Sequence, residues 1–167
     1  MTIGIHQPEY LPWPGFFNKI LKSEAFVILD NVQFSRGGVQ NRNRIKTARG
    51  VKWLTVPLAG HQMVPIKDTN IDNSRPWPTN HFTLLKDAYK NSLHFSELED
   101  FFEDLYLNQK FTKLVDLNLR IIKYLMDYLG LKTKLSLASS LKLRGQKNDL
   151  LLDICRKTGS DDYLSGM

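Results

Sequence analysis

The 167-residue chain is predicted to fold as an α/β protein, with a Rossmann-like, mainly parallel sheet flanked by helices and a helical C-terminal half. Two observations predict this class. Short apolar runs alternate with helical patterns over the first thirty residues, and strand-like segments return near the C-terminus after a long helical stretch. The length suggests one domain over residues 1–167. Because the chain stops just after a strand and a Ser-Gly turn, we expect the native protein to continue beyond Met167.

The first thirty residues predict a strand–helix–strand unit. The apolar run 3–5 ends on His6 and predicts a first strand, and a loop with three prolines follows it. Residues 15–23 have helical spacing of apolar side chains. The continuous apolar run 25–30 is typical of a strand buried on both faces of a parallel sheet. The connection between the two strands should be right-handed.

The rest of the chain adds further strands, a helical region and a final helix. Residues 31–50 are polar and basic and predict a loop, with Gly37-Gly38 as a turn. The remaining expected elements are a strand at 51–57, a short strand near Ile66 or Ile71, helices within 79–130 with Thr79 as N-cap and Gly130 as terminator, strands at 135–138 and 162–165, and a helix at 148–158 closed by Gly159.

The charge distribution indicates an anionic partner. The net charge is +6, and no Asp or Glu occurs in residues 31–67. Cations gather in that segment: Arg36, Arg42, Arg44, Lys46, Arg49 and Lys52. Acidic residues concentrate separately at 97–104, which argues against a uniformly basic nucleic-acid binder. The pattern favours a local site for a phosphorylated small molecule, such as a nucleotide sugar.

Targeting and redox features are few. No apolar run approaches the length of about 20 residues that spans a bilayer, and no secretory signal pattern opens the chain. The single cysteine, Cys155, excludes an intrachain disulfide. We expect a cytoplasmic protein.

Four segments carry a resemblance to a known family. They are HQPEYLPWPGFFNKI from His6, FVILDNVQF from Phe26, QNRNRIK from Gln40 and WLTVP from Trp53. Together they resemble the WbqC-like protein family, and a C-terminal match runs from Asp149 to Gly166. The resemblance covers nearly the whole chain and implies a role in bacterial O-antigen and surface-polysaccharide biosynthesis. Family members look longer than this chain at the C-terminus.

A looser resemblance concerns mechanism. A strand, a His-bearing Pro-rich loop and a helix starting near Gly15 are similar to the first βα turn of HIGH-type nucleotidyltransferases, especially their acylate-activating members. This resemblance implies nucleotide activation with ATP and Mg²⁺, and a phosphate contact from Ser165. The paired histidines of that loop have no counterparts here, since Pro14 and Phe16 stand near where they would fall.

His6 and Asp30 are the catalytic candidates. An imidazole titrates near neutral pH and can act as a base, an acid or a phosphate contact. Asp30 ends the neighbouring strand and could orient His6 or bind a hydroxyl or a metal. The alternatives stay open: His6 could cap the strand end, and Asp30 could cap the next turn. No His or Cys cluster has metal-ligand spacing.

The basic block supplies the substrate-binding candidates. Arg42 and Lys46 suit a pyrophosphate, with Arg36 as a third cation. Gln40 and Asn41 could read a base, a sugar or an amide. The other reading is a solvated basic loop.

The remaining candidates lie outside that block. Gln7 and Gln33 are further substrate-binding candidates, and Tyr10 could stack on a base or sugar. For Trp13 we expect packing in the core.

These residues lead to two hypotheses. The first is an enzyme that transfers an acyl or aminoacyl group to a nucleotide-linked amino sugar, with ATP and Mg²⁺ if a nucleotide activates the acid. The second is a non-catalytic nucleotide-sugar or nucleic-acid binding protein.

Overall fold

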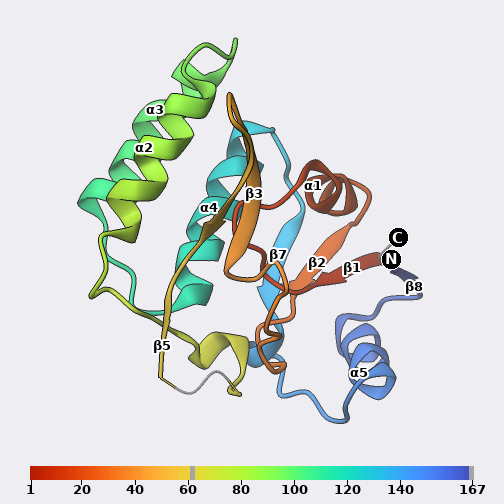
Figure 1. Ribbon diagram of the computed structural model, residues 1–167. Helices are drawn as coiled ribbons and strands as arrows, with labels where there is room; N and C mark the ends of the chain where they lie inside the picture. The colour runs from red at the N-terminus through yellow and green to blue at the C-terminus, as the bar shows by residue number, and fades with distance from the viewer. Residues whose placement is uncertain (61–62, 166–167) are drawn as a thin grey trace.

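A four-stranded parallel sheet forms the centre of the molecule in a computed structural model, which describes residues 1–60 and 63–165 (Figure 1). The strand order is β7-β2-β1-β8. The strands are β1 (Thr2–His6), β2 (Ala25–Ile28), β7 (Lys134–Leu137) and β8 (Asp162–Leu164). Each neighbouring pair is parallel. The predicted α/β class is confirmed.

Helices cover both faces of this sheet. On one face, Phe26 and Ile28 of β2 pack against α1 (Pro14–Leu21) and α4 (Leu114–Tyr128). On the other face, Ile3, Ile5 and Val27 pack against α5 (Asn148–Thr158). Side chains alternate between faces along a strand, so His6 lies on the same face as α1.

A second lobe packs against α4. An antiparallel hairpin of β3 (Arg42–Thr47) and β4 (Gly50–Thr55) lies between the sheet and a pair of helices, α2 (Trp77–Tyr89) and α3 (Phe95–Glu103) (Figure 1). A π-helical turn at Asp104–Asn108 follows α3. The shorter elements are β5 (Leu58–Ala59), β6 (Asn70–Ile71) and the 3₁₀ turns Ile66–Asp68 and Ala138–Ser140.

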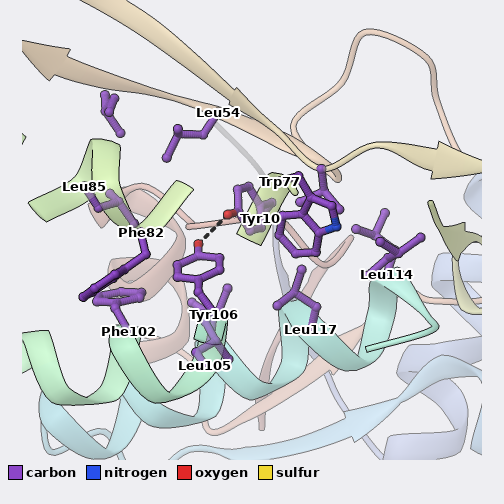
Figure 2. Packing of buried hydrophobic residues seen from close by; sticks show 14 of the residues in the cluster. Tyr10, Leu54, Trp77, Phe82, Leu85, Phe102, Leu105, Tyr106, Leu114 and Leu117 are labelled. Atoms are coloured by element: carbon purple, nitrogen blue, oxygen red, sulfur yellow. Dashed lines mark hydrogen bonds between the residues drawn. The ribbon is translucent and has the colours of Figure 1, made fainter. Parts of the chain in front are cut away.

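Tyr10, from the loop after β1, lies in the centre of this second lobe. Its ring has no exposed surface, and it packs in one core cluster with Trp77, Leu114 and Leu117 (Figure 2). Its hydroxyl bonds to the hydroxyl of Tyr106 from the π-helical turn. The loop after β1 therefore joins the two lobes.

Most predicted elements are confirmed, and two details are wrong. β3 lies inside the segment predicted to be a loop. The sequence RNRIKT does not indicate a strand because it buries only Ile45 and so lacks apolar alternation. Thr79 is not an N-cap, since α2 already begins at Trp77. Gly130 follows α4 with φ +68°, as a helix terminator should. No helix in the described residues is long and apolar enough to cross a membrane.

Candidate functional site

A pocket of about 150 Å³ opens beside His6, between α1 and the end of β8. Parallel sheets commonly bind ligands at the carboxyl ends of their strands. The lining residues are His6, Trp13, Gly15, Phe16, Asn18, Lys19, Lys22, Leu164 and Ser165. Of the predicted site residues, the pocket thus brings together His6 and Ser165. Gly166, which follows them in the predicted turn, lies outside the described residues.

The hydrogen bonding of His6 determines which ring nitrogen can take a proton. Nδ1 lies 3.0 Å from the carbonyl oxygen of Gln7. Because a carbonyl oxygen only accepts, the neutral ring carries its proton on Nδ1 and keeps a lone pair on Nε2. Burial lowers the pKa of His6, the Gln7 bond opposes this, and the charge of Lys19 lowers it further. The imidazole is therefore a neutral base at pH 7.

Glu9 lies behind His6. Its Oε1 is 3.7 Å from His6 Nδ1, and the side chain is only 6% exposed. Its other oxygen, Oε2, is buried with no hydrogen-bond partner. Burial raises the pKa of Glu9 to about 7. Near neutral pH the pair therefore holds the His6 Nδ1 proton either alone, with Glu9 ionised, or together with a proton on Glu9. A group that gains and loses a proton near neutral pH is useful in acid–base chemistry.

Lys19 brings a buried cation to the pocket. Its Nζ donates to the carbonyl oxygen of Ile5 at 2.8 Å. Ile5 directly follows Gly4, which forms the last residue pair between β1 and β8 with Leu164. Nζ also lies 5.4 Å from the ring centroid of Tyr163. Burial lowers the pKa of Lys19. The ammonium thus sits where the β1–β8 ladder ends.

Trp13 and Tyr10 exchange the roles that the sequence suggests. Trp13 is 56% exposed and lines the pocket, so its expected place in the core is wrong. Its indole covers Gly15, where a Cβ would meet the ring at 2.0 Å. Tyr10, expected at a ligand, is fully buried and bonds to His81 Nδ1 at 2.8 Å. Tyr10 therefore anchors the loop and has no surface for stacking on a ligand.

The Gln40-to-Asn43 segment holds the loop from its other side. Asn43 donates to the carbonyl of Leu11 at 2.6 Å, and Leu11 has φ +48°. Gln40 donates to the side chain of Gln7. A non-glycine residue with positive φ is strained, and such strain persists where neighbours hold it. The loop from His6 to Trp13 is thus fixed in one shape.

The predicted anion-binding residues lie in a different hollow. Arg36, Asn41 and Arg42 line a shallow depression. None of the described residues that line this depression also lines the His6 pocket. Arg42 lies 4.5 Å from the Trp53 ring centroid and donates to the carbonyls of Gly37 and Gly38.

Three further candidates lie apart from the His6 pocket. Lys46 is exposed on β3, and Gln33 is exposed and forms a bridge with Pro65. Asp30 is buried and caps the turn after β7, where it accepts hydrogen bonds from the Ser139 backbone at 2.8 Å and hydroxyl at 2.6 Å.

Sequence reasoning missed Glu9, Lys19 and Lys22 as site residues. Lys19 lies in the last turn of α1 and Lys22 is the C-cap three residues later, and this spacing on one side of a helix could have indicated them. Glu9 had no such signal, because only the folded loop brings it beside His6. No group of three or more His, Cys, Asp or Glu side chains within residues 1–60 and 63–165 could hold a metal ion.

The fold and the pocket define an α/β protein with a cationic site at the carboxyl end of its first strand. The chain belongs to the WbqC-like protein family, which it matches over residues 7–167. It is similar to Rv1507c, an uncharacterized protein of Mycobacterium tuberculosis, with 34% identity over 166 residues. That alignment covers 98% of this chain and 71% of the relative. No solved structure matches the chain.

Proposed function

We propose that this protein is a transferase of bacterial surface-polysaccharide (O-antigen) biosynthesis that joins an acyl or aminoacyl group to the amine of a nucleotide-linked sugar. The pathway rests on the family. The chemistry rests on one observation: His6 presents an unprotonated Nε2 beside a small pocket that contains two lysines.

His6 is the general base of the proposed reaction. The sugar amine attacks the carbonyl carbon of the activated acyl group, and the new C–N bond replaces the bond to the activating group. The amine proton passes to His6 Nε2, which its bond to Gln7 keeps free. Activation of a free acid requires ATP with Mg²⁺. The described residues contain no metal cluster, so the nucleotide phosphates would supply the main Mg²⁺ ligands.

Glu9 is a positioning residue in this scheme. When His6 gains a proton it becomes an imidazolium, and the carboxylate oxygen 3.7 Å from Nδ1 is placed to stabilise it. The ionised Glu9 carboxylate is then paired with the imidazolium cation, instead of being an isolated buried charge. This arrangement favours proton transfer to His6 during the reaction.

Arg42 is the proposed contact for the nucleotide diphosphate, with Lys46 and Arg36 nearby in the chain. The Arg42 guanidinium is held by two carbonyl oxygens and the Trp53 ring, which leaves part of its donor edge for a phosphate. Asp30 caps the turn after β7 and has no assigned step in this reaction.

The test is an assay of the purified protein with ATP, amino acids or other acids, and nucleotide-linked amino sugars, followed by mass spectrometry. We expect an acylated sugar that is lost in His6→Ala and retained in His94→Ala, a control at an exposed histidine that bonds to Glu97. Absence of product, or equal product from both variants, would refute the proposal.

A non-catalytic anion-binding role is the second candidate, and the outer face of the hairpin favours it. Arg42 and Arg44 both lie against the half-exposed ring of Trp53. Nucleic-acid binding through this face would weaken steeply with salt and would not depend on His6. A salt series with a single-stranded oligonucleotide therefore separates the two roles.

A further inference from the structure

Lys19 places a nearly buried positive charge at the pocket without a carboxylate beside it. The residue is 8% exposed, and within the described part of the chain its ammonium donates one hydrogen bond, to the Ile5 carbonyl. None of the described residues that line the pocket is Asp or Glu. Glu9, the carboxylate near His6, faces the Nδ1 side of that ring. A buried cation of this kind is stabilised by an anion from outside the protein.

The walls of the pocket are suited to a flat apolar group. The exposed indole of Trp13 lies over Gly15, whose missing side chain makes room for it. Phe16 and Leu164 supply further apolar surface. Phe16 also packs edge-to-face against His6, with ring centroids 5.3 Å apart. The apolar walls and the cation therefore meet beside the imidazole.

The donor set favours a carboxylate over a phosphate. An ammonium has three N–H groups, and Lys19 uses one of them on Ile5, which leaves two for two carboxylate oxygens. Lys22, three residues further along the chain, adds a more exposed charge. No arginine fork lines the described pocket, as bidentate phosphate recognition would favour. The cavity of about 150 Å³ is also small for a nucleotide.

We propose that the His6 pocket binds a small carboxylic acid, with its carboxylate on Lys19 and Lys22 and its apolar part against Trp13. This inference rests on the proposed function, since it assigns the acyl component to this pocket and leaves the nucleotide sugar to the hollow at Arg42. The carboxylate then lies next to His6, where the acyl group must react.

The test compares three probes of similar shape: benzoate, benzamide and phenyl phosphate. Binding is followed by tryptophan fluorescence and ligand-observed NMR, without ATP or sugar. Benzoate should bind at least about tenfold more tightly than benzamide, because benzamide keeps one accepting oxygen but lacks the negative charge and the second accepting oxygen of the carboxylate. Tighter binding of phenyl phosphate, or equal binding of benzoate and benzamide, would overturn the proposal.

Matched variants locate the binding. Lys22→Gln should weaken benzoate binding roughly threefold, as expected for a partly exposed charge, and Lys110→Gln is its control at an exposed lysine away from the pocket. Trp13→Ala should weaken binding further, and Tyr128→Ala is its control at an exposed aromatic residue on α4. If the pocket variants bind benzoate as their controls do, the pocket is not the site.

The outcomes also separate this inference from the proposed function. Benzoate binding that depends on Trp13 and Lys22, together with no transfer product, supports the pocket and refutes the transferase. Transfer that depends on His6, together with unchanged substrate use in Lys22→Gln and Trp13→Ala, supports the transferase and refutes the carboxylate pocket.

Discussion

Glu9→Gln should stabilise the protein at alkaline pH and leave it unchanged at acid pH. Burial raises the pKa of Glu9 from 4.5 to about 7, so the folded state holds this proton more firmly than the unfolded state does. A raised carboxyl pKa makes stability fall as pH rises from the unfolded value through the folded one. The contribution is therefore fully present below about pH 4.5 and lost above about pH 7.

The size of the effect follows from that difference. About 2.5 pKa units at 1.36 kcal/mol each give ~3 kcal/mol at pH 8. Glutamine has nearly the same shape as glutamate and no charge. It therefore removes the free-energy cost of an ionised Glu9 in the folded state and still fills the space beside His6. Because Oε2 has no hydrogen-bond partner, the substitution breaks no bond that the structure shows at that atom.

Urea unfolding of wild type and Glu9→Gln from pH 4 to pH 8.5 measures the effect directly. The two curves should coincide near pH 4 and separate between pH 5 and pH 7.5. Glu103→Gln, at an exposed glutamate, should follow the wild type throughout. Lower stability of Glu9→Gln at pH 8 would show that the ionised carboxylate is stabilising and would refute the reasoning. If Glu9 also positions His6, the same variant loses transfer activity as it gains stability.

Three further predictions concern β1, the loop after it and the start of α1. Gly4→Ala should cost about 2 kcal/mol of unfolding free energy, because its Cβ would lie 2.5 Å from buried side-chain atoms. Gly15→Ala should cost far less, since the clashing Trp13 ring is exposed and can move, but it should abolish benzoate binding; equal thermal melts of the two variants would contradict this. Asn43→Ala should cost about 1–2 kcal/mol in urea and broaden the NMR signals of the loop, because the bond that holds Leu11 is lost. Unchanged loop signals would show that other contacts hold it.

The centre of the sheet could be predicted from the sequence because β1 and β2 contain short apolar runs. The run at 25–30 is buried on both faces, so burial and pattern agree. β3 could not be predicted in this way, since tertiary contact with α2 and cross-strand pairing with β4 hold a polar strand that buries only Ile45. A hydrophobic pattern reflects burial, and this hairpin buries only Ile45 on β3 and Leu54 on β4, so neither strand shows a clear apolar alternation.

The sequence indicates the place of the candidate pocket at His6, and it indicates the other lining residues only in part. A polar residue at the end of the first strand of a parallel sheet is a positional signal, and it needs no side-chain geometry. The exchange between Tyr10 and Trp13 depends on which ring faces the second lobe. No periodicity exists within a Pro-rich loop to decide this. Likewise, nothing local indicates that Lys19 reaches the carbonyl of Ile5, fourteen residues earlier.

The buried Tyr10 explains why the loop after β1 belongs to both lobes. Its ring is part of the core that α2, the π-helical turn and α4 build, and its hydroxyl bonds to His81 and Tyr106. The two ends of the same loop, His6 and Trp13, face the pocket beside α1. The packing of the helical lobe therefore fixes the middle of the loop and, through it, the separation of the His6 imidazole from the exposed Trp13 indole. A substitution that breaks the hydrogen bonds of Tyr10 should therefore change the shape of the His6 pocket, although the substituted residue does not line that pocket.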